Sequence, residues 1–371
     1  MTQLVISNSA SSTNRLVSRE HDGRPFVSSL MKSHAVVFTA PNQVSFQEIS
    51  CPEPGPEDLL IDVHHSWISN GTEGSFLRGE RLSGDVAWKP GDPMPFPMVA
   101  GYQKVGRVSR VGSAVTGFTA GDWVFASMSK VEGMFENRYA GHVSPSVCDP
   151  RAVHRLPVGA NPLKFAGLVL TQVGFNCGSR SPITPGQIAV VMGDGLVGQW
   201  AGQTLAQRGA KVVMIGRHAY RLSRFKPYGT TLLGGTDFGV EAVKALKLGP
   251  IQVLVETVGD ARVLSSYLPL MARDGHMVIA GFYPRSGELN FQDSLQSFRN
   301  YEISFDLVSG MTRPRLDETL QWVDDGRLDT LGCLTHRFPV EEAAKAWKLI
   351  ESKSEPVLGV VLDWPASRKT F

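Results

Sequence analysis

The chain has 371 residues, more than one ordinary hydrophobic core accommodates, and this length predicts two domains. Hydrophobic residues make up 42% and charged residues 19% of the sequence, a balance typical of a folded globular protein. The formal net charge is only +2, and no basic block or long apolar run is present. The composition therefore excludes the usual signatures of nucleic-acid and membrane binding and favours a small-molecule partner.

The cysteines lie far apart in the sequence and include no Cys-x-x-Cys pair: Cys51, Cys148, Cys177 and Cys333. This spacing argues against a disulfide framework and a structural zinc cluster, and it predicts a reducing, cytoplasmic location. Residues 1–30 contain no apolar stretch of signal-peptide length, so we expect them to form an N-terminal extension. The recognisable fold is expected to begin near Met31.

The first part of the fold is predicted to be a small, partly open β-barrel. Short runs rich in β-branched and aromatic residues are bounded by Gly, Pro and Asn turns. These expected strands are Ala35–Phe38, Val44–Phe46, Leu59–Val63, Gly106–Val111 and Trp123–Ala126. The strand-rich texture continues to about Pro157.

The second part alternates helices and strands, which predicts a doubly wound parallel sheet of the Rossmann type. A helix is expected at 163–177, followed by strands at 188–192, 211–215, 251–255, 276–280 and 303–305. Helices at 315–326 and 340–351 lead to a last strand at 359–362 that is expected to return to the first lobe. The predicted fold class is α/β, with a barrel lobe at 31–160 completed by 311–371 and a Rossmann domain at 161–310.

A glycine motif directly follows the first Rossmann strand. The residues Gly193-Asp-Gly195-Leu-Val-Gly198 form Gly-x-Gly-x-x-Gly between the strand at 188–192 and a helix expected at 197–208. Glycines at these places allow a tight turn and close approach of the backbone to a pyrophosphate. The motif predicts a dinucleotide site in which Gly193, Gly195, Leu196, Val197 and Gly198 contact the cofactor.

The end of the next strand indicates which nucleotide is bound. NAD enzymes usually carry an acid there to bind the adenosine ribose, whereas this chain has Gly216 followed by Arg217, His218 and Arg221. Without the carboxylate, the two arginines can hold a 2′-phosphate, so NADPH is the predicted cofactor. The alternative is that the arginines only cover a solvated helix start. Further cofactor contacts are expected from Thr257, Val258, Gly281 and Phe282.

The order of barrel lobe, inserted Rossmann domain and returning strand, together with the stretches Pro97–Gly101, Gly106-Arg-Val and Gly121-Asp122, resembles the medium-chain dehydrogenase/reductase superfamily. The resemblance covers about residues 31–364. It implies a GroES-like barrel as catalytic domain, an oxidoreductase activity and a homodimer. The stretches Ile68–Glu73 and Gly101–Gln103 resemble the branch typified by bacteriochlorophyllide hydroxyethyl dehydrogenases.

The chain departs from the zinc-containing members of that superfamily at the metal ligands. The resemblance places Ser69 or Asn70, Tyr102 and Thr171 where those enzymes hold catalytic zinc with Cys, His and a third Cys or acid. Such side chains are poor zinc ligands, and the region that holds the structural zinc contains no cysteine, so a zinc-independent enzyme is expected. The alternative of a rebuilt metal site would draw on His64, His65, Glu73 and His142.

Without a metal, hydrogen-bond donors must stabilise the charge that hydride transfer places on oxygen. The resemblance directs Tyr102 toward the nicotinamide pocket as the oxyanion or proton donor. Thr72 is expected to pass the proton outward, while Ser69 and Asn70 orient the carbonyl. The alternative role for these three polar residues is to satisfy the backbone of a turn.

The leading hypothesis is a zinc-independent, NADPH-dependent oxidoreductase that interconverts a carbonyl and an alcohol. The alternatives are an NADPH-dependent enone or quinone reductase, and a non-catalytic NADPH-binding sensor or scaffold. A flat or apolar substrate is expected if the aromatic side chains line the pocket: Trp67, Phe76, Trp88, Phe96 and Phe135. The Gly- and Pro-rich segment 76–97 is expected to form a loop beside the cleft.

Overall fold

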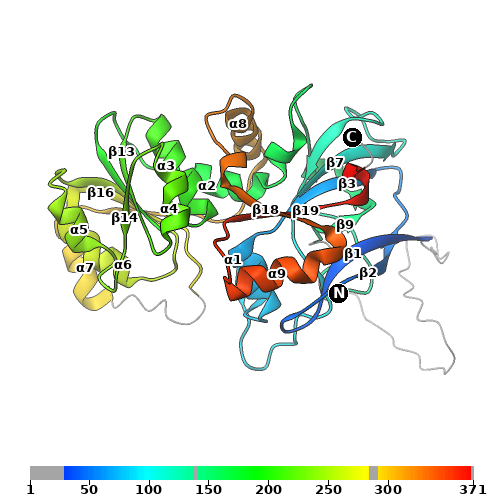
Figure 1. Cartoon of the computed structure of the whole chain (residues 1–371), viewed down its shortest axis with the longest axis horizontal. Helices are drawn as coiled ribbons and strands as arrows, with labels where there is room; N and C mark the ends of the chain where they lie inside the picture. The colour runs from blue at the N-terminus through cyan, green and yellow to red at the C-terminus, as the bar shows by residue number, and fades with distance from the viewer. Residues whose placement is uncertain (1–28, 138–139, 284–290, 369–371) are drawn as a thin grey trace, which may run out of the picture.

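The computed structural model describes residues 29–137, 140–283 and 291–368. Figure 1 shows two lobes side by side, with the Rossmann sheet in one and the antiparallel strands in the other. Of the predicted N-terminal extension, residues 1–28 lie outside the described part of the chain. No helix in the described ranges is long and apolar enough to cross a membrane. All four cysteines are buried and free.

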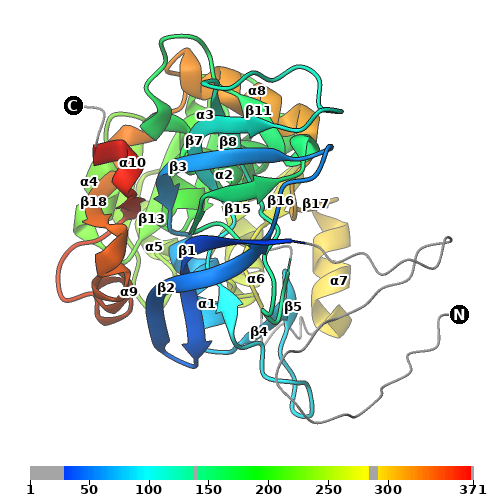
Figure 2. The ribbon, with the colours of Figure 1, turned by 90° about the vertical axis from the view of Figure 1, so that its right-hand side faces the viewer.

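The barrel lobe is built mainly from two sheets, one antiparallel and one mixed, and Figure 2 turns this lobe toward the viewer. The smaller sheet consists of β2 (Gln43–Pro52), β1 (Leu30–Ala40), β6 (Met98–Val99) and β9 (Val143–Ser144). The larger sheet follows the order β11 (Val153–Arg155), β8 (Trp123–Ala126), β7 (Lys104–Val111), β3 (Leu59–Trp67), β19 (Gly359–Asp363) and β18 (Leu334–Pro339), with β10 (Ser146–Cys148) also on β3.

The predicted return of the chain to the first lobe is confirmed. Strand β19 pairs antiparallel with β3, with Val361 opposite Trp67, and β18 lies parallel to β19. The segment before these strands contains α8 (Arg313–Asp324), and α9 (Ala343–Ser352) lies between them. The domain boundaries at residues 160 and 310 stay a prediction.

The second lobe is a parallel six-stranded sheet, as the alternation of helices and strands predicted. Its order is β14 (Thr230–Leu233), β13 (Lys211–Gly216), β12 (Ile188–Met192), β15 (Ile251–Glu256), β16 (Met271–Ile279) and β17 (Ser304–Leu307). Its helices are α2 (Leu168–Arg180), α3 (Leu196–Gln207), α4 (Ala219–Phe225), α5 (Val240–Ala245), α6 (Arg262–Tyr267) and α7 (Phe291–Asn300).

Both faces of this sheet are covered because its strands are apolar at successive positions. Val190 packs in a cluster with residues of α5, α6 and α7, and the next residue, Val191, packs with residues of α2, α3 and α4. Strand order reverses between β12 and β15, where the chain moves from one half of the sheet to the other. Ligands of open α/β sheets bind at the carboxyl ends of the strands beside such a switch point.

A shared core joins the two lobes. Trp67 at the end of β3 and Trp200 in α3 are both fully buried, with ring centroids 6.1 Å apart. Their cluster extends from Val105 in the barrel to Phe175 in α2 and Leu316 in α8. The apolar packing that positions the cofactor lobe is thus continuous with the barrel.

The structure corrects one sequence expectation in the barrel lobe and decides between two pairs of alternatives. The loop expected at 76–97 contains the hairpin of β4 (Arg81–Ser83) and β5 (Val86–Ala87), and Ser69, Asn70 and Thr72 lie at the start of helix α1 (Asn70–Leu77). The five aromatic side chains proposed for the pocket do not line the cleft. Trp67 is instead in the shared core, and Phe76 and Phe96 pack against a second barrel cluster.

Burial of His64 generates a prediction for stability. The ring is 6% exposed in β3 and contacts Trp123, with centroids 4.5 Å apart. Burial, with His65 and Arg107 as smaller causes, lowers the pKa of His64 to about 4. The unfolded chain takes up this proton below about pH 6.5, so stability is lost as the pH falls from there toward 4.

We expect His64→Phe, which keeps a ring against Trp123, to lose less stability on acidification than wild type. Between about pH 7 and about pH 4.5 the difference in unfolding free energy should be about 2 kcal/mol. Urea denaturation at the two pH values measures it. Equal losses in both proteins would show that His64 does not titrate abnormally.

Candidate active site

A cleft of about 1100 Å³ lies between the two lobes. The Rossmann lobe contributes the ends of its parallel strands and the loops that follow them, and the barrel lobe contributes α1 and the start of its hairpin. Fifteen of the seventeen predicted site residues line this cleft: Ser69, Asn70, Thr72, Gly193, Gly195, Leu196, Val197, Gly198, Gly216, Arg217, His218, Arg221, Thr257, Val258 and Phe282. Tyr102 and Gly281 are not on its wall.

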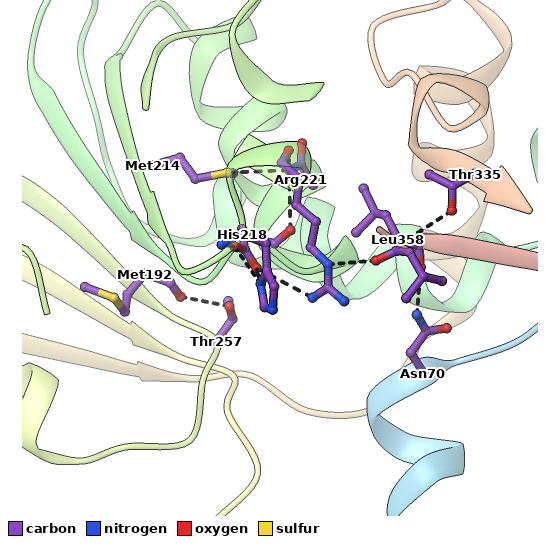
Figure 3. Close-up of polar contacts among 11 residues, drawn as sticks. Asn70, Met192, Met214, His218, Arg221, Thr257, Thr335 and Leu358 are labelled. Carbon is purple, nitrogen blue, oxygen red and sulfur yellow. Dashed lines mark hydrogen bonds and ion pairs between the residues drawn. The ribbon is translucent and has the colours of Figure 1, made fainter. Parts of the chain in front are cut away.

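The glycine loop between β12 and α3 is packed against the neighbouring strand end. A Cβ on Gly198 would lie 2.0 Å from the carbonyl oxygen of Gly193, and a Cβ on Gly193 would lie 2.2 Å from Oγ1 of Thr257. Thr257 in turn donates a hydrogen bond of 2.8 Å to the Met192 carbonyl (Figure 3). Gly195 differs from the other two, because a Cβ there would meet no atom within 4 Å.

This arrangement fits a pyrophosphate. Two glycines are required for the loop to fold, and the third leaves open space at the start of α3, where unpaired backbone N–H groups and the helix dipole favour an anion. Leu196 and Val197 in the first turn of α3 line the same part of the cleft.

A buried acid supports the loop after β15. Glu256 is fully buried, and its Oε1 accepts hydrogen bonds from the backbone N–H groups of Val258 (2.6 Å) and Gly259 (2.8 Å). Oε2 accepts from the hydroxyl of Tyr283. Burial raises the pKa of Glu256, and these hydrogen bonds oppose the rise. Gly281 lies behind the wall, where a Cβ would be 2.5 Å from Oε2 of Glu256.

The end of the cleft at Gly216, where the sequence predicts the adenosine ribose, differs from that prediction in its charge. Gly216 ends β13 without a side chain, as expected, but a Cβ there would lie 2.4 Å from Oδ2 of Asp194. The carboxylate that Gly216 lacks is thus supplied by the second residue of the glycine motif. The prediction that this end carries no acid is wrong, because the motif spacing fixes the glycines and does not show where the side chain between them points.

The three basic residues of this region differ in the contacts they make. His218 donates its backbone N–H to Oδ2 of Asp194 at 2.8 Å, and Nη1 of Arg221 lies 3.6 Å from Oδ1. Arg221 also donates from Nε to the Val357 carbonyl at 2.8 Å, so it points across the cleft toward the segment that holds Leu358 (Figure 3). Arg217 is exposed on the cleft wall. Of the two arginines expected to hold a phosphate, Arg221 is therefore engaged in other contacts, and Arg217 alone makes no hydrogen bond to another described residue.

The predicted catalytic residues gather at the opposite end of the cleft. Ser69, Asn70 and Thr72 line the wall at the start of α1. Asn70 donates from Nδ2 to the Leu358 carbonyl at 2.7 Å, while its buried Oδ1 has no partner among the described residues. Tyr102 lies behind Ser69 and Thr72 and packs against the shared core.

Tyr102 is a protonated donor in this environment. Burial is the main cause that raises the pKa of its phenol to about 12. The hydroxyls of Ser69 and Thr72 oppose the rise as hydrogen-bond partners, Glu73 adds to it and Arg81 lowers it. The phenol therefore stays protonated beside Ser69 and Thr72, and Tyr102 is not among the residues that line the cleft.

The places of the zinc ligands are taken by side chains with other partners. Thr171 donates from Oγ1 to the Gly167 carbonyl at 3.0 Å inside α2. Of the alternative ligands, His142 and Glu73 form a buried pair at 2.9 Å. His65 binds Asp363 at 2.7 Å instead. No group of three His, Cys, Asp or Glu residues that could hold a metal ion occurs within the described ranges.

Arg81 is a cleft residue that the sequence prediction missed. The side chain is 4% exposed, donates to Oγ of Ser75 at 2.6 Å and to Oδ1 of Asp85 at 2.8 Å, and stands 3.5 Å from the ring centroid of Phe282. This cation–π contact joins the hairpin of the barrel lobe to the Rossmann lobe. A single arginine in a Gly- and Pro-rich segment gives no sequence signal for burial, so only the fold reveals it.

The fold and the cleft define an alcohol dehydrogenase-like oxidoreductase with a nicotinamide cofactor site. Residues 55–168 match the family described as Alcohol dehydrogenase GroES-like domain, and residues 197–325 match the family described as Zinc-binding dehydrogenase. The chain belongs to the medium-chain dehydrogenase/reductase superfamily.

Relatives cover almost the whole chain at low identity. The 2-desacetyl-2-hydroxyethyl bacteriochlorophyllide A dehydrogenase of Cereibacter sphaeroides is 25% identical over 347 residues, which is 91% of this chain and all of the relative. The 5-exo-hydroxycamphor dehydrogenase of Pseudomonas putida is 25% identical over 374 residues, covering 89% and 99%. The structure of alcohol dehydrogenase from Thermus sp. matches with a TM-score of 0.74 at 22% identity, covering 89% and 99%.

A second neighbouring structure contains a bound cofactor. A putative zinc-binding dehydrogenase from Sinorhizobium meliloti bound to NADP has a TM-score of 0.73 and 21% identity, and the match covers 90% of this chain and 99% of the other. This likeness shows that the two chains share their fold.

The two kinds of glycine in the loop predict different mutant phenotypes. Gly198→Ala places a methyl group against backbone, so we expect about 1–3 kcal/mol lower stability. Gly195→Ala adds a methyl group in open space on the cofactor side, so stability should change by about 0.5 kcal/mol or less. The affinity of Gly195→Ala for NADPH should nevertheless fall at least about ten-fold, because the backbone approach to the pyrophosphate is blocked.

Thermal unfolding and fluorescence titration with NADPH measure these two effects. A Gly195→Ala protein that binds NADPH like wild type would show that the pyrophosphate does not lie at this loop.

Proposed function

We propose that the chain is a zinc-independent oxidoreductase that interconverts a carbonyl and an alcohol with NADP(H). The observation that carries this proposal is the catalytic end of the cleft. Hydroxyl groups of Ser69 and Thr72 lie on the wall, the protonated phenol of Tyr102 lies behind them, and the guanidinium of Arg81 lines the same cleft. These groups supply hydrogen-bond donors and a positive charge where hydride transfer builds negative charge on oxygen.

The residues at the metal positions do not fit a catalytic zinc. Asn70 uses its amide nitrogen on the Leu358 carbonyl, and Thr171 uses its hydroxyl inside α2. The phenol of Tyr102 is kept protonated by burial. Zinc needs thiolate, imidazole or carboxylate ligands, and this set offers none. We therefore derive the chemistry from side chains alone.

In the direction of reduction, a nicotinamide dinucleotide bound in the cleft would supply the hydride for the carbonyl carbon, and the electron pair of the C=O π bond would move to oxygen. Ser69 or Thr72 donates a hydrogen bond to that oxygen and then its proton. Tyr102 returns a proton to the hydroxyl group, and solvent restores the phenol. Oxidation of the alcohol reverses each transfer.

Arg81 supplies the positive charge that a Lewis-acid metal ion would supply in a zinc enzyme. Its guanidinium remains charged, is almost completely removed from solvent and is fixed by Ser75, Asp85 and the ring of Phe282. A fixed charge in a site that excludes water stabilises an oxyanion far more than it would in bulk water. The ring of Phe282 provides an aromatic surface at this end of the cleft, against which a flat or apolar substrate can pack.

The relatives support an alcohol as substrate. The names of the Cereibacter and Pseudomonas enzymes specify a hydroxyethyl bacteriochlorophyllide and a hydroxycamphor. We propose a small apolar ring compound that carries a ketone or secondary alcohol. The proposed cofactor is NADP(H), because Arg217 is exposed on the wall beside Gly216, where a 2′-phosphate would be held.

We also propose a homodimer formed at the edge of the Rossmann sheet. Strand β17 is the last strand of that sheet and leaves one side unpaired within the described part of the chain. Its last residue, Leu307, is 74% exposed. An exposed apolar edge of this kind is the surface on which a second copy can add its own strand.

The proposed chemistry predicts turnover without metal and a dependence on two residues. Protein purified without chelator should hold less than about 0.1 zinc per chain and should reduce ketones with NADPH. Tyr102→Phe should lower kcat at least about ten-fold by removing the proton source, and Arg81→Gln at least about a hundred-fold by removing the charge on the oxyanion. Stopped-flow measurement of NADPH oxidation, with metal analysis of the same protein, tests both.

The affinity of both variants for NADPH serves as the control and should stay within about three-fold of wild type. Stoichiometric zinc, or full turnover in Tyr102→Phe, would contradict the mechanism. Enones in the same substrate panel distinguish carbonyl reduction from carbon–carbon double-bond reduction.

The proposed nucleotide predicts a selective effect of Arg217. Arg217→Ala should weaken NADPH binding about ten-fold or more, since one charge-assisted hydrogen bond to phosphate is lost. Binding of NADH, which has no 2′-phosphate, should change less than about two-fold. Isothermal titration with both nucleotides measures the difference, and equal losses for the two would remove Arg217 from the phosphate site.

A further inference from the structure

The side chain of Asp194 takes the place of the missing residue at the end of β13. A Cβ on Gly216 would lie 2.4 Å from both Cβ and Oδ2 of Asp194, so the two positions cannot both carry side chains. In dinucleotide-binding sheets of this kind, an acid at the end of this strand accepts the hydroxyls of the adenosine ribose. Here the carboxylate reaches the same point from the glycine loop instead.

The contacts of Asp194 leave one of its oxygens available. Oδ2 accepts the backbone N–H of His218 at 2.8 Å, and Nδ1 of the ring lies 3.0 Å away. The contacts of Oδ1 are longer, at 3.2 Å to Nδ1 of His218 and 3.6 Å to Nη1 of Arg221. The residue is 5% exposed and lines the cleft. Oδ2 therefore fixes the turn, while Oδ1 retains acceptor capacity toward a ligand.

The positive charges around Asp194 neutralise its carboxylate only in part. Arg221 is shared with the Val357 carbonyl, and burial lowers its pKa. Arg217 lines the cleft, and no hydrogen bond joins it to Asp194 within the described ranges. A ribose hydroxyl would gain a hydrogen bond from Oδ1, whereas a 2′-phosphate would meet both the attraction of Arg217 and the repulsion of Asp194.

We infer that Asp194 is the adenosine-ribose acid of this enzyme and sets its discrimination between the two nucleotides. It accepts the ribose 2′-hydroxyl of NADH and opposes the phosphate of NADPH, so the protein binds both forms instead of excluding NADH. The inference rests on the proposed function for its cofactor class. It differs from the sequence argument, which took Gly216 to mean that no acid is present.

Asp194→Asn tests the inference because the amide keeps the size of the side chain and an acceptor for His218 while removing the charge. We expect the affinity for NADH to fall at least three-fold and that for NADPH to rise at least three-fold, so that their ratio moves about ten-fold toward NADPH. Binding of each nucleotide is measured by quenching of protein fluorescence, which does not depend on turnover. Asp194→Ser, which also keeps an acceptor, is the second variant if the asparagine protein does not fold.

Asp260→Asn is the matched control. Asp260 lines the same cleft but pairs with Arg262, so its removal changes the cleft charge equally without touching Gly216. The ratio of affinities should stay within two-fold in this variant. An unchanged ratio in Asp194→Asn, or the same change in both variants, would overturn the inference alone. Failure of wild type to bind either nucleotide would overturn the proposed function as well.

Discussion

The cofactor end of this molecule depends on the absence of side chains where three strand ends meet. The ends of β12, β13 and β15 approach so closely that Gly193, Gly198 and Gly216 have backbone, Thr257 or Asp194 atoms where a Cβ would be. This packing brings the loop, the start of α3 and the Thr257 segment into one wall. Behind that wall, the buried Glu256 holds the loop that follows Thr257.

The two ends of the cleft contain buried charges of opposite sign. At the adenosine end, a buried carboxylate is balanced by His218 and Arg221, and an exposed Arg217 adds positive charge. At the catalytic end, Arg81 is buried beside hydroxyl groups, and a phenol stays protonated. At both ends the buried charge has a partner of opposite sign, Arg221 for Asp194 and Asp85 for Arg81, which offsets part of the cost of removing the charge from water.

Much of the fold could be predicted because periodicity and glycine spacing are local properties of the sequence. The strand at 188–192 was placed within its exact bounds, and the return of the last strand to β3 followed from the order of elements. The hairpin at Arg81–Ala87 was missed because its strands are too short to show a pattern.

Site residues could be predicted where their role depends on the backbone conformation of the loop. They could not be predicted where the role depends on the direction in which a side chain points. Gly193 and Gly198 of the motif were predictable because a Cβ at either position would meet neighbouring atoms. The charge at Gly216 was misjudged because Asp194 reaches it from a different strand end. Tyr102 was expected on the wall, but Ser69 and Thr72 line the cleft and Tyr102 does not, because a sequence motif does not show which of its side chains reach the cleft.

The segment at Val357–Leu358 receives a hydrogen bond from each half of the molecule, from Arg221 on one side and Asn70 on the other. Two adjacent peptide carbonyls of one segment thus accept from residues at opposite ends of the cleft. This segment fixes the distance between the two ends without contributing a side-chain hydrogen bond of its own to either residue.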